Sequence, residues 1–209
     1  MSKKSIIDTT ITAILIDGGF YRKRANAAIG KVSPEERADE LETYCKRHLQ
    51  ENINNVIHCH NLYRIFYYDC PPSKMAVYNP VSKNNIELSK TDNYKWTVKF
   101  FECLKKKRKF ALRLGELANV DDIKESDLRL NMLQKGVDMR IGLDIASLTY
   151  KKQVNQIVLI SGDSDFVPAA KLARREGVDF VLDPLGQKVK DSLFEHIDGL
   201  NIRDSKFKK

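Results

Sequence analysis

Long hydrophobic runs are missing from this chain of 209 residues. Its longest aliphatic segments are Ile14 to Ile16 and Ile157 to Ile160, whereas a helix needs about 20 consecutive apolar residues to cross a bilayer. No signal-peptide pattern opens the sequence either. We therefore expect a cytoplasmic protein that has no membrane partner.

Cysteine is scarce, and its spacing lacks the pairs that zinc ribbons require. The four cysteines are Cys45, Cys59, Cys70 and Cys103. With no CxxC pair and no regular spacing, they argue against a disulfide framework and indicate reduced thiols. The segment His58-Cys59-His60 would put both imidazoles on one face of an extended strand, as half of a metal site. Solvated or packed side chains remain the more common explanation of such a cluster.

Acidic residues are too few to balance the basic ones. The chain has 36 Lys and Arg against 28 Asp and Glu, which leaves a formal charge of +8 and a pI near 9.2. A basic surface attracts polyanions, and nucleic acid is the first candidate partner. Many small soluble proteins are basic without binding nucleic acid, so charge alone does not decide the matter.

Repeats and low-complexity segments are absent as well, and 42% of the residues are hydrophobic. Residues 1–209 are therefore expected to form a single domain, with a less regular insert at about residues 73–134.

Strand and helix patterns alternate along the rest of the chain. We expect strands at residues 11–16, 61–68, 110–114, 156–160 and 178–182, and helices at residues 33–51, 96–106, 137–150 and 165–176. The first strand is expected to run into a tight turn at Asp17-Gly18-Gly19. Such alternation predicts an α/β fold with a doubly wound, mainly parallel sheet and helices on both faces. Ligands of such sheets bind outside the carboxyl ends of the strands, where the winding reverses.

Aspartates follow two of these strands. Asp17 follows the first strand, and Asp163 and Asp165 follow the strand at 156–160. Each aspartate alone is more often a turn former or a helix cap, and Asp165 stands where a helix is expected to begin. Three carboxylates at one edge of a sheet instead favour a ligand site.

The helix at 137–150 carries two further candidates. Asp138 and Asp144 fall on the two edges of its apolar stripe. Asp138 could simply favour the helix dipole, and Asp144 could bond to the backbone of a neighbouring loop. An all-carboxylate cluster suits Mg²⁺ or Mn²⁺ and not zinc. On a phosphodiester, one or two such ions would activate water and stabilise the developing charge.

Three ordered motifs carry a family resemblance: ILIDGGF (residues 14–20), KGVDMRIGLD (135–144) and VLISGDSDFVPAAKLARREG (158–177). Together they resemble the NYN domain of the LabA-like type, a branch of the PIN-like nuclease superfamily, over most of residues 11–183. The resemblance implies a PIN-like fold and a metal-dependent ribonuclease. It also implies that the catalytic and metal-binding residues are Asp17, Asp138, Asp163 and Asp165. Asp144 matches a family aspartate too and is assigned a supporting role, because its helical phase differs from that of Asp138.

Basic residues supply candidate contacts to a phosphate backbone. They are Lys105, Lys106, Lys107, Arg108, Arg174 and Arg175, with further charge in the tail at Lys206, Lys208 and Lys209. A solvated face is the simpler explanation of such runs. Aromatic side chains at Tyr67, Tyr68, Trp96, Phe100 and Phe101 could stack on unpaired bases, although aromatics at this spacing are usually core. Single-stranded or looped RNA is the favoured substrate, while DNA is not excluded and a monomer and a homodimer both stay open.

Two other functions compete with the nuclease. One is a non-catalytic RNA-binding or regulatory module that retains the acidic pocket. The other is a hydrolase of small phosphate esters, which normally needs a second aspartate two residues after the first. Gly19 occupies that position, so this function ranks last.

Overall fold

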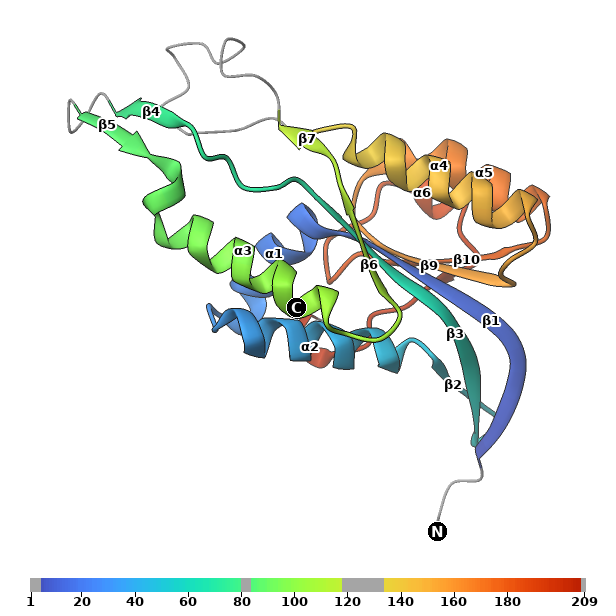
Figure 1. Ribbon diagram of the computed structural model, residues 1–209. Helices are drawn as coiled ribbons and strands as arrows, with labels where there is room; N and C mark the ends of the chain where they lie inside the picture. The colour runs from blue at the N-terminus through green and yellow to red at the C-terminus, as the bar shows by residue number, and fades with distance from the viewer. Residues whose placement is uncertain (1–4, 80–83, 118–133, 208–209) are drawn as a thin grey trace.

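The computed structural model describes residues 5–79, 84–117 and 134–207. A curled, mainly parallel sheet forms the middle layer, with helices on both of its faces (Figure 1). Helices α4, α5 and α6 cover one face, and helices α1, α2 and α3 cover the other. The predicted fold class is therefore confirmed.

The main sheet has seven strands. They are β1 (Ser5–Asp17), β2 (Gln50–Ile53), β3 (Val56–Asp69), β6 (Phe110–Leu114), β9 (Gln156–Ile160), β10 (Asp179–Asp183) and β11 (Gly199–Leu200). The spatial order is β11-β10-β9-β1-β3, with both β6 and β2 paired to β3, and β2 is antiparallel. The chain winds outward from β1 through β3 to β6 and then returns to β9 on the other side of β1. The winding therefore reverses between β1 and β9.

Alternation along the central strands builds two cores. Ala13 and Leu15 of β1 face α4 and α5, whereas Ile14 and Ile16 face the opposite helices. Strand β9 is buried along its whole length. Strands that are buried on both faces read as continuous aliphatic runs, which explains why the sequence revealed them.

Helices α1 (Gly18–Ile29), α2 (Pro34–Arg47) and α3 (Asp92–Lys105) form the layer that packs on one face. The predicted start of α2 is confirmed, because Ser33 and Glu36 form a capping box there. Its apolar stripe of Ala38, Leu41 and Cys45 is fully buried against the sheet.

The opposite layer contains α4 (Val137–Tyr150), the 3₁₀ turn η3 (Ser164–Phe166), α5 (Val167–Arg175) and α6 (Asp191–Phe194). The bounds of α4 agree with the prediction, and the residues of its apolar stripe, Ile141, Ile145 and Leu148, are buried. The predicted helix at 165–176 is instead split into η3 and α5.

The turn that was predicted at Asp17-Gly18-Gly19 is wrong. Both glycines lie in the first turn of α1, which begins directly after β1. Asp17 caps this helix and thereby compensates for two residues of poor helix propensity.

The predicted helix at 33–51 is too long. Helix α2 ends at Arg47, and residues 50–53 form β2, which makes a hairpin with β3. Asn54 and Asn55 connect the two strands with positive φ angles of 50° and 64°, a conformation that asparagine tolerates well. The Asn-Asn pair was the sequence signal for this turn.

Smaller elements complete the structure. They are the hairpin of β4 (Ala76–Asn79) and β5 (Asn84–Glu87), η1 (Leu88–Lys90), the ladder of β7 (Glu116–Leu117) and β8 (Gln134–Lys135), and η4 (Ser205–Phe207). The range that was predicted as an insert thus contains both α3 and β6 of the main layers, and the single-domain assignment stays a prediction. Among the described residues, the helices are too short or too polar to cross a membrane.

Candidate active site

Asp17 stands at the carboxyl end of β1, where the winding of the sheet reverses. Its carboxylate accepts a hydrogen bond of 3.0 Å from the backbone N–H of Phe20 and so caps α1. A Cβ atom on Gly18 would lie 2.5 Å from the ring of Tyr67 and 2.6 Å from the carbonyl oxygen of Tyr68. Glycine at this position therefore lets α1 begin in contact with β3, which fixes Asp17 at the edge of the sheet.

The loop after β9 brings Asp163 beside Asp17. Ser161 is fully buried, and its hydroxyl lies 3.5 Å from Asp17 Oδ2. The same hydroxyl accepts the backbone N–H of Asp163 at 3.2 Å, and Asp163 in turn accepts the N–H of Asp165 at 3.0 Å. One serine thus links the ends of the two strands between which the winding reverses.

Asp138 reaches the same place from the first turn of α4. Partial burial raises the pKa of its carboxyl, and repulsion from Asp163 and Asp165 raises it further. The structure therefore brings the four aspartates that were predicted to form the site to the same edge of the sheet, and their catalytic and metal-binding roles stay predictions.

The pKa of Asp17 rises from its ordinary value of 3.8 to about 6. Burial is the largest cause, the N–H of Phe20 opposes it, and the charges of Asp138, Asp69 and Asp163 add to it. Crowded carboxylates that repel one another are typical of sites that gain stability from a bound cation.

Asp69 is a further acid near Asp17 that was not predicted to belong to the site. It ends β3 as Asp17 ends β1, and that shared position was the signal that could have revealed it. Arg22 of α1 forms an ion pair with its Oδ2 at 2.9 Å, and the hydroxyl of Tyr67 donates to it at 3.2 Å. Asp69 is fully buried and contributes to the raised pKa of Asp17.

Asp144 lies apart from this cluster. It accepts a hydrogen bond of 2.7 Å from the hydroxyl of Tyr68 and pairs with Arg113 Nε at 3.1 Å. These side chains, and not loop backbone, satisfy its charge. Arg113 also lies 5.1 Å above the ring centre of Phe66, so Asp144 ties α4 to β3 and β6.

The donor set suits a hard divalent ion. Asp17, Asp138, Asp163 and Asp165 offer carboxylate oxygens alone, the ligands that Mg²⁺ and Mn²⁺ prefer. Within the described residues, however, no three His, Cys, Asp or Glu side chains already surround one point closely enough to hold an ion. The chemistry of the donor set thus fits such a metal.

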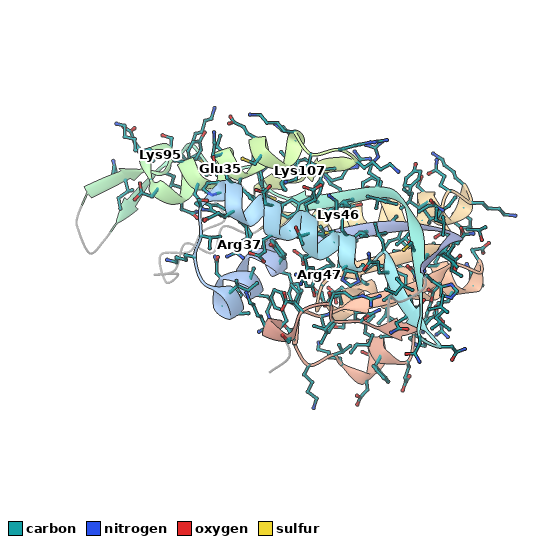
Figure 2. The ribbon with its side chains drawn as sticks, turned by 90° about the horizontal axis from the view of Figure 1, so that it is seen from below. Glu35, Arg37, Lys46, Arg47, Lys95 and Lys107 are labelled. Carbon is teal, nitrogen blue, oxygen red and sulfur yellow. The ribbon has the colours of Figure 1, made fainter. Side chains whose placement is uncertain are left out.

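The predicted basic residues do not lie at this edge. Helices α3 and α5 run antiparallel to the strands, so the segments at their ends, residues 105–108 and 174–175, lie toward the amino edge of the sheet. Lys107 Nζ is bound by Asp39 at 2.6 Å and Glu42 at 2.8 Å, between α2 and α3 (Figure 2). Arg174 pairs with Asp198 at 2.8 Å. Lys107 and Arg174 thus each have an acidic partner in the folded protein, and their contact with nucleic acid stays a prediction.

The aromatic residues that were considered for base stacking belong to the core. Tyr67 and Tyr68 are fully buried, and Phe100 packs on Trp96 with ring centres 5.0 Å apart. The alternative that such aromatics are core is confirmed for these residues.

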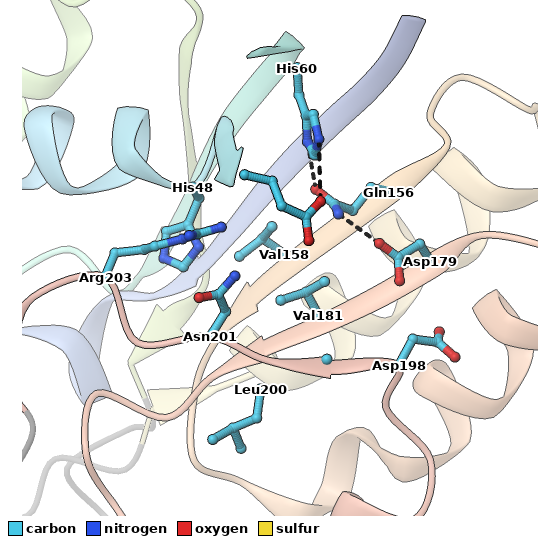
Figure 3. A pocket seen from close by; sticks show the side chains of 12 residues that line it. His48, His60, Gln156, Val158, Asp179, Val181, Asp198, Leu200, Asn201 and Arg203 are labelled. Carbon is cyan, nitrogen blue, oxygen red and sulfur yellow. Dashed lines mark hydrogen bonds and ion pairs between the residues drawn. The ribbon is translucent and has the colours of Figure 1, made fainter. Parts of the chain in front are cut away.

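A polar cavity lies toward the amino ends of β9 and β10 (Figure 3). Several polar groups at this cavity are hydrogen-bonded: Gln156 accepts from Thr12 at 2.9 Å and donates to Asp179 at 2.6 Å, and His60 lies 3.3 Å from Gln156. His60 is thus a hydrogen-bonded residue of this network and not half of a metal site with His58. The cavity contains none of the four predicted site aspartates.

Comparison with known protein families identifies the domain. The family model of the NYN domain matches residues 38–193, which is more than half of the chain. This chain belongs to the NYN domain family. NYN domains are part of the PIN-like nuclease superfamily, and the observed sheet with helices on both faces is a PIN-like fold. The matched segment includes Asp138, Asp163 and Asp165, whereas Asp17 precedes it.

Two known proteins resemble this NYN domain, one over part of its sequence and one in its fold. The uncharacterised protein y4oD of Sinorhizobium fredii is 37% identical over 67 residues, a match that spans 30% of each chain. The crystal structure of a protein of unknown function, VPA0982, from Vibrio parahaemolyticus superposes with a TM-score of 0.52. That match covers 95% of this chain and 96% of the other at 15% identity, and so it supports the fold alone.

Proposed function

We propose that this NYN domain is a metal-dependent endoribonuclease that hydrolyses phosphodiester bonds in single-stranded or looped RNA. The observation that carries the proposal is the placement of Asp17, Asp138, Asp163 and Asp165 at one edge of the sheet, where its winding reverses. Membership of a nuclease superfamily supports the same chemistry. The three sequence motifs further support a place in the LabA-like branch.

The proposed metal is Mg²⁺ or Mn²⁺, held by Asp17, Asp138, Asp163 and Asp165. When bound, such an ion lowers the pKa of a water molecule and neutralises charge that develops on the attacked phosphate. With a pKa of about 6, Asp17 still gives up its proton at neutral pH, so its carboxylate is ready to accept a cation.

The surrounding residues hold the carboxylates in place. The Phe20 N–H fixes one oxygen of Asp17, and Ser161 lies against the other. Arg22 forms an ion pair with Asp69, and its positive charge offsets part of the repulsion between Asp69 and Asp17. These contacts preorganise the site, so that less free energy is needed to arrange it around a cation.

RNA is the proposed partner, with DNA as the alternative substrate. The formal charge of +8 supports a polyanionic partner. Lys105, Lys106 and Arg108 are exposed near the amino edge of the sheet, and so is Arg175. We propose that they contact RNA that extends beyond the acidic site.

The decisive experiment compares Asp163→Asn with the parent protein on a fluorescent single-stranded RNA, with Mn²⁺ and with EDTA. Because even indirect supports of a metal ligand contribute about 10–100-fold, we expect Asp163→Asn to slow cleavage by about 100-fold or more. Asp179→Asn is the matched control, since Asp179 is exposed at the opposite edge of the sheet. Equal cleavage by parent and Asp163→Asn, or cleavage in EDTA, would refute the proposed mechanism.

A non-catalytic RNA-binding module is the second candidate. It is favoured by the spacing of the described acidic side chains, no three of which already surround a single ion site. This function predicts intact RNA in every reaction, together with RNA binding in a gel shift that survives EDTA. The same set of samples thus distinguishes the two functions.

A further inference from the structure

A groove lies between α4 and α5 directly beside the acidic site. Its lining comprises Asp138, Met139 and Gly142 from α4 and Asp165, Phe166, Pro168, Ala169 and Leu172 from η3 and α5. The groove is an open surface depression with a volume of about 440 Å³.

The groove has a charged part and an apolar part. Its only charged lining residues are Asp138 and Asp165, two of the four site carboxylates, and the rest is almost entirely apolar. Phe166 is only 2% exposed, whereas Met139 is 71% exposed. Met139 thus offers an exposed apolar side chain directly beside the two carboxylates.

Small residues keep the groove open. A Cβ atom on Gly142 would meet no atom within 4 Å, although Gly142 lies in the middle of a helix that packs against α5. Ala169 lines the groove from α5. Glycine inside a helix costs about 0.5–1 kcal/mol relative to alanine, and no close packing in the described structure requires glycine here.

We propose that this groove receives an unpaired nucleobase next to the phosphate that is held at the acidic site. This inference rests on the proposed function. A ligand that spans the acidic site and the groove needs two groups joined by a short linker. One group binds the cation that the carboxylates would hold, and the other is flat and apolar and lies in the groove. A nucleotide in a single strand meets both requirements, whereas a duplex hides the faces of its bases by stacking. The groove would therefore make the site selective for single strands.

The test fills the groove without touching a carboxylate. Gly142→Leu places a side chain into open space, and Leu143→Ala on the same helix is the control, because Leu143 is 63% exposed and does not line the groove. Both changes are made in an Asp163→Asn background, so that binding is measured without cleavage. Thermal melts check that each variant is folded.

Fluorescence anisotropy in Mn²⁺ then compares a single-stranded RNA with an abasic oligonucleotide of the same length. We expect Gly142→Leu to weaken binding of the RNA by about tenfold, in line with the contribution of one stacked base, and Leu143→Ala to leave it within twofold. The abasic strand should bind weakly and equally to all three proteins.

Three results would overturn the inference. RNA affinity could be unchanged in Gly142→Leu, or the abasic strand could lose as much affinity as the RNA. Light scattering could show a dimer that Gly142→Leu converts to a monomer, which would make the groove a protein interface. Because these measurements compare binding in a shared background, they stay informative even if the parent protein cuts no RNA, which is the result that would refute the proposed function.

Discussion

Individual aspartates in this protein have opposite roles, although the sequence presents them alike. Asp17 sits among other carboxylates that raise its pKa, whereas Asp144 has its own arginine and tyrosine partners. Asp69 is buried against Arg22 and yet acts on Asp17 through its charge. Local sequence could predict that aspartates end these strands, but it could not assign partners that come from other elements.

The raised pKa of Asp17 predicts a pH-dependent stability difference. Asp17 is protonated in both folded and unfolded states below its ordinary pKa of 3.8, and it ionises in the folded protein only near pH 6. The folded state therefore loses stability as pH rises from about 4 to 6, and the full cost is present above that range. In EDTA, Asp17→Asn should raise the free energy of unfolding at pH 7.5 by about 1–3 kcal/mol, and the gain should shrink toward pH 4.

Urea unfolding at both pH values provides the measurement. Asparagine can still cap α1, so the N-terminus of the helix should be preserved. Asp179→Asn should show no such gain, because its exposed side chain lies at the other edge of the sheet. If Asp17→Asn and the parent had the same free energy of unfolding at pH 7.5, ionised Asp17 would not destabilise the folded protein as proposed.

At the scale of elements, the clearest patterns in the sequence gave the correct structures. The aliphatic run of β9 and the amphipathic pattern of α4 predicted their bounds, and the capping box predicted the start of α2. Helix α1 was missed because two glycines at its start resemble a turn. Only the contact of α1 with β3 explains why a glycine is needed there.

That contact predicts opposite effects for two glycine substitutions. A Cβ on Gly18 would overlap Tyr67 and the backbone of Tyr68, so Gly18→Ala should destabilise the protein by about 1–3 kcal/mol. Gly142→Ala meets open space in the middle of α4 and should stabilise it by about 0.5–1 kcal/mol. Denaturant unfolding measures both, and equal effects of the two changes would show that packing against β3 is not what requires Gly18.

At the scale of the whole molecule, the end of the described chain closes one of the two cores. Phe207 of η4 is 1% exposed and packs edge-on against Tyr44 of α2, with ring centres 5.4 Å apart. A Cβ on Gly186, which follows β10, would lie 1.7 Å from the carbonyl oxygen of Phe207. A segment that was considered for its lysines thus also anchors the helical layer.

Phe207→Ala should therefore lower the free energy of unfolding by about 3 kcal/mol, as expected for removing a buried aromatic ring. Phe194→Ala serves as the control, because Phe194 is 56% exposed and its loss should change stability by less than about 0.5 kcal/mol. Urea midpoints compare the two variants. If Phe207→Ala were as stable as Phe194→Ala, the C-terminal turn would not belong to the core.

The sequence by itself determined the doubly wound α/β fold and predicted the aspartates that follow β1 and β9, because buried parallel strands and the residues after them are local patterns. Only the tertiary structure decided which charges meet. In the folded protein, Asp69 lies near Asp17, and Asp144 forms an ion pair with Arg113. Lys107 forms ion pairs with two acidic residues of α2. The physical reason is that electrostatic interaction depends on distance in space and on burial, and both are set by how separate elements pack.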